Sequence, residues 1–246
     1  MLDFHCHILP GVDDGPKTLE DSLWLAREMA KAGFSEVVAT PHFAAEGGLL
    51  EPEEVIRQVE VLNQALGAEG IALKVYPGME LYLTPELPEL IFQEKVLGLK
   101  GEQIYLIELP LTQKPPWLTF YLAEILGAGK KVVIAHPERY RYLREDQEEV
   151  ENLLDMGVSF QVSLTSFLSG YFGEGSRKSA RWFLEKGALV GTDAHGPGNI
   201  KFLEEYLKPE LFANNRRFLE GKSLKPVSLE FPEEKPKKKK SWFKFF

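Results

Sequence analysis

Five histidines are the residues of this 246-residue chain whose type and spacing could do chemistry. Each falls at or just after the end of a short β-branched or aliphatic run that predicts a strand. They are His5, His7, His42, His136 and His195. A single histidine is more often a structural or surface residue than a ligand. Structural or surface roles poorly explain five histidines at the equivalent ends of strands. Their placement predicts one common site.

Two pairs have a spacing that suits metal binding. Because alternate residues of a strand point to the same side, His5 and His7 can both reach one ion while Cys6 faces away. Asp193 and His195 repeat this spacing at the last predicted strand. Either pair alone would be a weak indication of a metal site.

Carboxylates occur at the same ends of the predicted strands as the histidines. They are Asp14, Glu80, Glu108 and Asp193. Nine nitrogen and oxygen ligands without a thiolate suit two or three divalent ions such as Mn²⁺, Zn²⁺ or Fe. Clustered ions imply a bridging water or hydroxide as nucleophile, and a phosphoryl group is the substrate that best matches them.

A basic residue follows the fifth predicted strand and could bind such a phosphoryl group. Arg139 lies three residues after His136, and a guanidinium can hold phosphate through two parallel hydrogen bonds. The alternative is an ion pair with a surface acid. Arg141, Arg144 and Arg177 are weaker candidates for the same role.

Two other phosphatase chemistries can be tested against the residues. A cysteine-dependent phosphatase needs the pattern C-x5-R, but the residue six after Cys6 is Val12. The stretch TDAHG at 192–196 resembles the G-D-x-H-G motif of binuclear metallophosphoesterases. Its G-N-H-E partner is absent and the stretch comes last instead of first, so we discount this chemistry.

The elements that must position these residues alternate between strand-like runs and helical patterns. Strands are predicted at 2–7, 35–40, 71–77, 103–109, 131–136, 158–163 and 188–193. Helices are predicted at 18–32, 52–66, 117–127, 146–156, 177–186, 199–207 and 209–219, while 78–102 is ambiguous. Thr18 and Asp21 fit a capping box, and Gly33 fits a C-terminal cap. The alternation predicts an α/β fold, a closed (β/α)7 barrel, with an open doubly wound sheet as the alternative.

Composition narrows the class of protein. A hydrophobic fraction of 44% excludes disorder over most of the chain, and the single cysteine excludes an internal disulfide. No apolar stretch approaches the roughly 20 residues that cross a membrane. Because the first residues also lack the pattern of a signal peptide, we expect a cytoplasmic protein. The net charge of −8 argues against general nucleic-acid binding.

The charge is unevenly distributed along the chain. Residues 235–246 contain six lysines and no acid, which leaves 23 basic and 37 acidic residues in 1–234. We expect residues 221–246 to be an extension of the domain. Its lysines and aromatic residues could make weak peripheral contact with an anionic membrane, but a solvated end is the favoured interpretation.

The chain resembles the polymerase and histidinol phosphatase (PHP) superfamily, and more narrowly the bacterial manganese-dependent protein-tyrosine phosphatases of capsule and exopolysaccharide operons. The resemblance covers residues 1 to about 220. It rests on DFHCHILPGVDDG at 3–15, VVATPHF at 37–43, PGMEL at 77–81, IEL at 107–109, AHPERY at 135–140 and GTDAH at 191–195. It implies a distorted seven-stranded PHP barrel over residues 1–220, with two or three metal ions, Mn²⁺ first and Fe or Zn²⁺ as alternatives.

The resemblance also implies roles for individual residues. One ion would take His5, His7, Glu80 and Asp193. Glu80 would bridge to a second ion with Glu108 and His136, and a third would take Asp14, His42 and His195. Arg139 would bind the phosphate, and Arg139, Asp14 and His42 would be the catalytic residues. The implied mechanism is attack of a metal-bound hydroxide on phosphorus with tyrosinate leaving.

The expected function is a metal-dependent protein-tyrosine phosphatase. Its substrate would be a tyrosine kinase or polysaccharide co-polymerase that regulates capsular or exopolysaccharide synthesis. The alternatives are a small-molecule phosphatase such as a histidinol phosphatase, or a non-catalytic metal-binding module. One departure from the family is the stretch Gly196, Pro197 and Gly198, after which no arginine occurs before Arg216. A second phosphate-binding arginine is therefore in doubt, and Lys201 could replace it only as a point charge.

Overall fold

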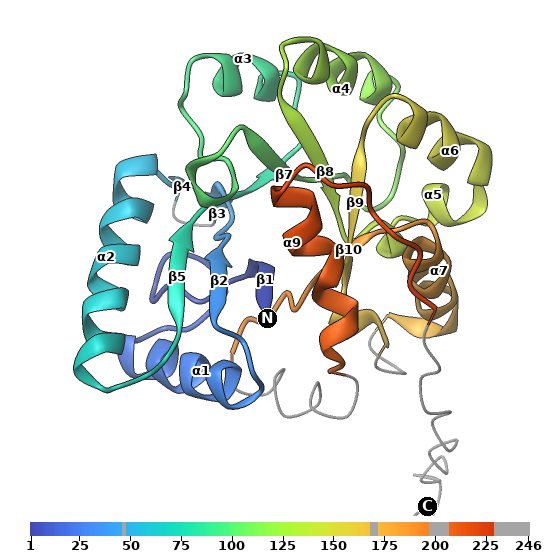
Figure 1. Ribbon diagram of the computed structural model, residues 1–246. Helices are drawn as coiled ribbons and strands as arrows, with labels where there is room; N and C mark the ends of the chain where they lie inside the picture. Colours follow the sequence, from blue (N-terminus) through green and yellow to red (C-terminus); the bar gives the residue numbers. More distant parts are fainter. Residues whose placement is uncertain (46–47, 168–171, 197–206, 229–246) are drawn as a thin grey trace, which may run out of the picture.

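The computed structural model describes residues 1–45, 48–167, 172–196 and 207–228 (Figure 1). Parallel strands form the centre of the fold. They are β1 (Leu2–Cys6), β2 (Glu36–Ala39), β5 (Lys74–Pro77), β6 (Glu80–Tyr82), β7 (Ile104–Glu108), β8 (Lys131–Ala135), β9 (Ser159–Ser163) and β10 (Leu189–Gly191). A two-stranded antiparallel hairpin, β3 (Ala44–Ala45) and β4 (Gly48–Leu49), follows β2.

The strands close into a distorted barrel. One sheet has the order β1-β2-β5 and the other β10-β9-β8-β7-β6. Parallel bridges from Cys6 to Ala194 and from His42 to Glu80 join the two sheets at both seams. All seven predicted strands are confirmed, and the open sheet was wrong. Two short strands, β5 and β6, together occupy the third position of the barrel: β5 pairs with β2, and β6 pairs with β7.

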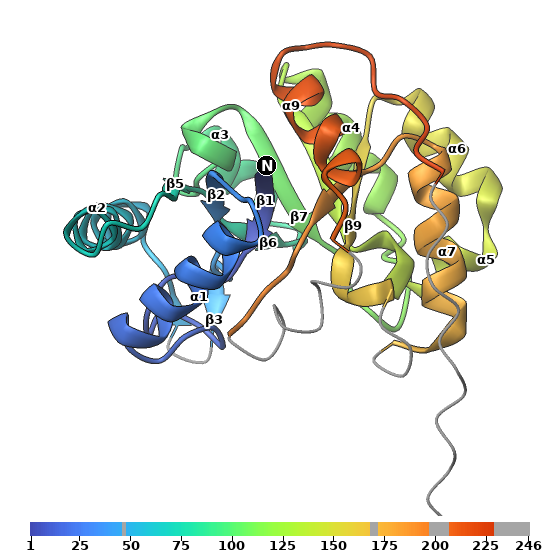
Figure 2. The ribbon, with the colours of Figure 1, turned by 60° about the horizontal axis from the view of Figure 1, so that its bottom comes forward.

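Helices lie outside the strands around the ring (Figures 1 and 2). They are α1 (Leu19–Lys31), α2 (Pro52–Ala68), α3 (Leu87–Phe92), α4 (Leu118–Gly127), α5 (Arg141–Glu145), α6 (Gln147–Asp155) and α7 (Gly173–Glu185). The predicted capping box of Thr18 and Asp21 begins α1. Short 3₁₀ turns η1 (Leu99–Gly101), η2 (Pro137–Arg139) and η3 (Leu164–Phe167) follow strands or precede them.

Two helix boundaries differ from the predictions. Helix α7 begins at Gly173 instead of residue 177, because Gly173 and Gly175 have low helix propensity and hide the first turn. The stretch 209–219 divides into a 3₁₀ turn, η4 (Pro209–Phe212), and α9 (Ala213–Leu219). The helix predicted at 199–207 lies almost wholly outside the described residues. The ambiguous segment 78–102 contains β6, α3 and η1.

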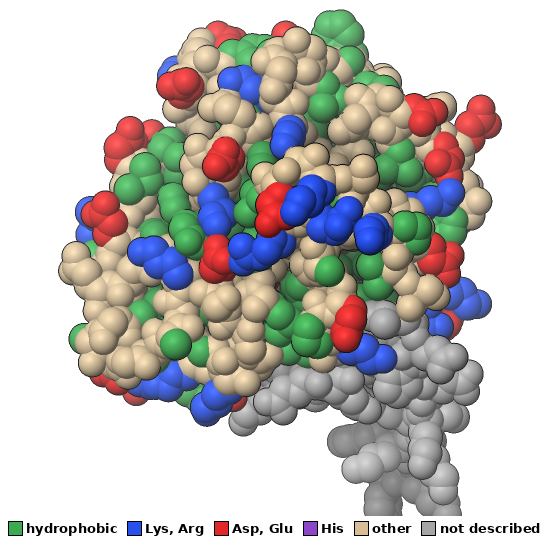
Figure 3. All heavy atoms as spheres, in the orientation of Figure 1, with side chains coloured by type: hydrophobic (Ala, Val, Ile, Leu, Met, Phe, Trp, Pro, Cys, Tyr) green, Lys and Arg blue, Asp and Glu red, His purple; other side chains and the backbone are tan. Residues whose placement is uncertain are grey.

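One end of the barrel is covered by α9. Asn215 on this helix accepts a hydrogen bond from the amide of Val190 and donates to the carbonyl of Leu2. Phe218 packs edge-on against Phe4 at 6.3 Å between ring centroids. Beyond the helix, the amide of Val227 bonds the carbonyl of Leu184 at 2.9 Å. Lys and Arg side chains gather on this face over α9, and no histidine is visible on it (Figure 3).

The register of β1 changes between Asp3 and Cys6, the interval that contains His5. Asp3 pairs with Val37 but Cys6 pairs with Ala39, so β1 uses one more residue than β2 over this interval. Such a shift reverses which side chains face inward. Phe4 therefore packs in the cluster inside the barrel, whereas Cys6 packs in the cluster between strands and helices. Within the described residues, no helix is long and apolar enough to cross a membrane.

Candidate metal centre

The histidines and carboxylates predicted as ligands meet at the end of the barrel opposite α9. The structure brings together three groups whose ligand atoms lie within 4.8 Å of one another. They are His7 with Asp14, His42 and His195; His5 with His7 and Asp193; and His42 with Glu80 and Glu108. Close contacts with Glu80 also place His136 in this cluster. All nine residues are therefore near one another in space.

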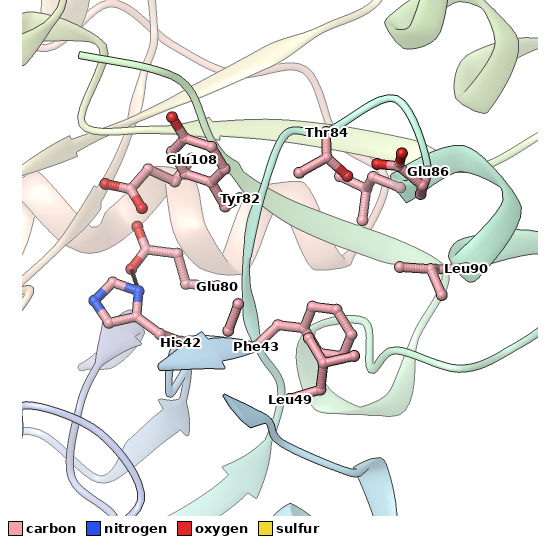
Figure 4. Close-up of a pocket in the computed structure, with 11 residues that line it drawn as sticks. His42, Phe43, Leu49, Glu80, Tyr82, Thr84, Glu86, Leu90 and Glu108 are labelled. Carbon is pink, nitrogen blue, oxygen red and sulfur yellow. Dashed lines mark ion pairs between the residues drawn. The ribbon is translucent and has the colours of Figure 1, made fainter. Parts of the chain in front are cut away.

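Glu80, at the start of β6, lies at the centre of the cluster. One carboxylate oxygen is 3.2 Å from Nε2 of His5 and 3.2 Å from Nδ1 of His42. Figure 4 shows the ion pair between His42 and Glu80. The other oxygen is 2.8 Å from Nε2 of His136. Glu108 lies at the edge, 3.9 Å from the same nitrogen of His136. The arrangement suits a carboxylate shared between neighbouring ions.

A second part of the cluster opens toward solvent. The carboxylate of Asp14 is 66% exposed and lies 3.3 Å from Nε2 of His195 and 3.7 Å from Nε2 of His42. Asp193 is buried and places Oδ1 3.4 Å from His5 and 3.5 Å from His7. The cluster therefore has a closed floor and an accessible side at which a substrate could enter.

Three residues that sequence reasoning missed fix the orientations of the rings. Nδ1 of His7 donates to Asp13 at 2.7 Å, and Nδ1 of His5 donates to Oε1 of Gln161 at 2.7 Å. The hydroxyl of Tyr140 lies 3.1 Å from Nδ1 of His136. Such contacts leave the other ring nitrogen for a metal ion. Asp13 and Tyr140 stand inside the quoted motifs, but Gln161 has no local signal that could have found it.

The backbone is strained at two cluster residues. His136 and Asp193 have φ of 34° and 52°, in the left-handed region that non-glycine residues seldom adopt. Both follow the end of a parallel strand. Such strain persists only where surrounding contacts impose it, and it is concentrated at functional sites. Here it turns the chain sharply, so that the side chains stay at the mouth of the barrel.

Arg139, the predicted phosphate ligand, lies on η2 beside the cluster. Its guanidinium pairs with Asp193 and donates to Ser163 at 3.1 Å and Thr165 at 3.3 Å. It also stacks 4.2 Å from the ring centroid of Phe172. The ion pair is thus with a carboxylate of the cluster and not with a surface acid. All three contacts use Nη2, and the buried Nε has no hydrogen-bond partner among the described residues.

Electrostatics divide the histidines of the metal-free protein into two kinds. Burial lowers the pKa of His5, but the carboxylates of Glu80 and Asp193 outweigh it and raise the value to about 9. Burial and the charge of Arg139 lower the pKa of His136 to about 4. Burial and the charge of Glu80 raise the pKa of Glu108 to about 7. His136 is therefore neutral near pH 7, whereas His5 is protonated on both ring nitrogens and carries a positive charge.

The donor set fits divalent cations. It consists of imidazole nitrogens and carboxylate oxygens, and Cys6 is buried on the other side of β1 near Met29. Several buried acids lie close together, an arrangement that is costly unless positive charge compensates it. Imidazole and carboxylate ligands in this mixture suit Mn²⁺, Fe and Zn²⁺.

Known proteins are similar to this chain over most of its length. YwqE of Bacillus subtilis, a tyrosine-protein phosphatase, is 31% identical over 220 residues, covering 89% of this chain and 85% of YwqE. A solved structure from work on YwqE from Bacillus subtilis and CpsB from Streptococcus pneumoniae, described as unique metal-dependent tyrosine phosphatases, has a TM-score of 0.79 at 28% identity. It covers 93% of this chain and 100% of that one.

A more distant structure, hisK of Listeria monocytogenes, shares the fold with a TM-score of 0.52 at 10% identity, over 81% of this chain and 97% of that one. The model of the family described as "Capsular polysaccharide synthesis, CpsB/CapC" matches residues 1–201, which include every residue of the cluster. This chain therefore belongs to the CpsB/CapC family of capsular polysaccharide synthesis.

Proposed function

We propose that this protein is a metal-dependent protein-tyrosine phosphatase. The observation that carries the proposal is the convergence of five histidines, four acids and Arg139 at one mouth of the barrel. Relatives with the same architecture are tyrosine phosphatases. The alternative of a non-catalytic metal-binding module is not favoured, because all nine expected ligands are present and lie together.

All nine clustered residues would hold two or three ions, with Mn²⁺ as the first expectation. Bound ions would lower the pKa of a coordinated water and neutralise the charge of the phosphoryl group. Glu80 would be shared between ions because it lies between His5, His42 and His136. Asp14 and His42 would complete the open side, next to the point where substrate enters.

Arg139 would bind the phosphoryl oxygens. Ser163, Thr165 and Asp193 hold one end of its guanidinium, so the group is oriented before substrate arrives. These contacts use Nη2, so Nη1 would supply the donor to the phosphoryl group. Among the described residues of the cluster no second arginine stands opposite it, so the ions would carry the rest of the phosphate charge.

The substrate would be a tyrosine-phosphorylated protein of capsule synthesis, such as a tyrosine kinase or polysaccharide co-polymerase, met in the cytoplasm. This part of the proposal rests on the family, whose description names capsular polysaccharide synthesis. Contact of the lysine-rich end with anionic lipid stays a prediction, because residues 229–246 lie outside the described part of the chain.

Metal removal tests the proposal. Dialysis against a chelator should abolish hydrolysis of a phosphotyrosine peptide, and added Mn²⁺ should restore it. His136→Ala and Asp14→Ala should be nearly inactive, whereas Asp155→Ala, an exposed acid at the end of α6, should keep full activity. Full activity after exhaustive chelation would contradict the metal centre. A rate on histidinol phosphate that exceeds the peptide rate by orders of magnitude would favour the small-molecule phosphatase.

A further inference from the structure

A cavity of about 600 Å³ opens directly beside the metal centre. Its inner end is formed by three residues of the cluster, His42, Glu80 and Glu108. Figure 4 shows them at one side of the cavity, with Phe43, Leu49 and Leu90 extending away from them. The volume lies within the range of about 300–1,000 Å³ that is typical of small-ligand sites. The cavity is therefore continuous with the reaction site and large enough for part of a substrate.

The outer part of the cavity is largely apolar, with Thr84 and Glu86 on one side of it. Its walls come from the β3–β4 hairpin, β6 and α3, and the apolar lining consists of Phe43, Ala44, Leu49, Leu87 and Leu90. Leu49 is 64% exposed, and Tyr82, which pairs with Glu108 across β6 and β7, is 44% exposed. Large apolar side chains that gather in an open hollow mark a binding surface more often than a packing feature.

The charges in the cavity exclude the phosphoryl group itself from its outer part. The lining residues include Glu80, Glu86 and Glu108 and neither lysine nor arginine. Arg139 lies on the other flank of the cluster, held by Ser163, Thr165 and Asp193 from β9, η3 and the end of β10. A phosphoryl group between the metal ligands and Arg139 would thus direct its ester substituent toward the apolar flank.

We propose that this cavity binds the aromatic ring of the phosphorylated side chain, so that Phe43, Leu49 and Leu90 select aryl phosphomonoesters over small alkyl ones. The inference rests on the proposed phosphatase function and adds the residues that determine its specificity. Figure 4 shows Phe43 and Leu49 nearer the metal ligands and Leu90 farther from them. The hairpin and α3 are therefore the elements that distinguish a tyrosyl substrate from a small polar one.

Phosphonates test the cavity by affinity alone. Hydrolysis rates of phosphomonoesters would also vary with the leaving group. Dissociation constants of methylphosphonate, phenylphosphonate and 2-aminoethylphosphonate are measured by calorimetry on the Mn²⁺-loaded full-length protein. Phenylphosphonate should bind at least about tenfold more tightly than methylphosphonate, since apolar pockets discriminate by that order for small groups. Leu49→Ser and Ala44→Trp should reduce the ratio to about threefold or less. Phe120→Ser, which changes a side chain of similar exposure on α4, should leave it unchanged.

Each other outcome contradicts the assignment. Equal affinities of the phenyl and methyl compounds in the unchanged protein would remove the aromatic slot. Tighter binding of 2-aminoethylphosphonate would show that Glu86 and Glu108 attract a cationic substituent instead. Either result would contradict the role of the cavity without contradicting the phosphatase function. The phosphatase function itself would fail if the Mn²⁺-loaded protein hydrolysed no phosphomonoester. Leu49 is mostly exposed, so Leu49→Ser should fold normally.

Discussion

Nδ1 of His5 donates a hydrogen bond of 2.7 Å to the side-chain carbonyl of Gln161, a residue 156 positions away on β9. The amide group of Gln161 is itself oriented, because its nitrogen donates to the carbonyl of Val162 at 2.7 Å. Both side chains are fully buried. The contact therefore determines which ring nitrogen of His5 faces Glu80 and Asp193.

Replacing Gln161 tests this contact. Gln161→Leu keeps a similar size but removes the acceptor, and we expect Mn²⁺ affinity to fall about 10- to 100-fold, the usual cost of losing a partner of a ligating histidine. Calorimetric titration of the metal-free protein measures it. Gln93→Leu, at an exposed position after α3, should leave affinity unchanged. If Gln161→Leu binds Mn²⁺ normally, the hydrogen bond does not orient His5.

Arg139 should be required for its geometry and not only for its charge. Arg139→Lys keeps the positive charge but loses the planar group that contacts Ser163, Thr165 and Asp193. We expect kcat/KM for a phosphotyrosine peptide to fall about 10²- to 10³-fold. Arg141→Lys provides the matched control, because its side chain is 76% exposed and pairs with Glu145. Unchanged kcat/KM in Arg139→Lys would show that the charge alone is sufficient, and equal losses in both variants would show that the effect is not specific to Arg139.

Metal binding should release a proton from His5. Its pKa of about 9 in the metal-free protein lies above the ordinary value of 6.5, so the ring is charged at pH 7 and must become neutral to bind a metal. Affinity should therefore rise as the pH increases toward 9. Mn²⁺ titrations in buffers of different ionisation enthalpy measure the release.

Two variants test whether His5 is the source of that proton. His5→Gln should remove about one proton from the release. His136→Gln should not, because His136 has a pKa of about 4 and is already neutral. Binding heats that are the same in every buffer for the unchanged protein would show that His5 is a neutral imidazole at pH 7, with no proton to release.

Gly191 should tolerate no side chain. A Cβ at this position would lie 2.5 Å from Cβ of His5 and 2.7 Å from Nε2 of Gln161. We expect Gly191→Ala to lower the free energy of unfolding by about 1–3 kcal/mol, the usual cost of overpacking, and to weaken Mn²⁺ binding. Urea unfolding and metal titration measure the two effects.

The control for this substitution is Gly67→Ala near the end of α2. Apart from the backbone of its own helix and its chain neighbours, no atom lies within 4 Å of a Cβ there, so the change should raise the free energy of unfolding by about 0.5–1 kcal/mol through helix propensity. If Gly191→Ala is as stable as Gly67→Ala, the barrel has more room around His5 than the structure shows.

Much of the fold was predictable because its signals are local. Runs such as VVIA mark buried parallel strands, and all seven appear in the barrel. The segment 78–102 stayed ambiguous because β6 has only three residues and pairs with β7 instead of extending the sheet of β5. The first turn of α7 was missed because glycines conceal it. Long-range pairing decided the first case, and the low helix propensity of glycine explains the second.

The sequence by itself determined the residue types of the site and their position at the carboxyl ends of strands, because strand periodicity and motif spacing are properties of short segments. Strand alternation also fixed that His5 and His7 face together, away from Cys6. Only the tertiary structure decided that this side is the interior, through the register shift between Asp3 and Cys6. It also brought Gln161 against His5 and the apolar cavity against Glu80, because such contacts join strands that are distant in the chain and depend on barrel closure.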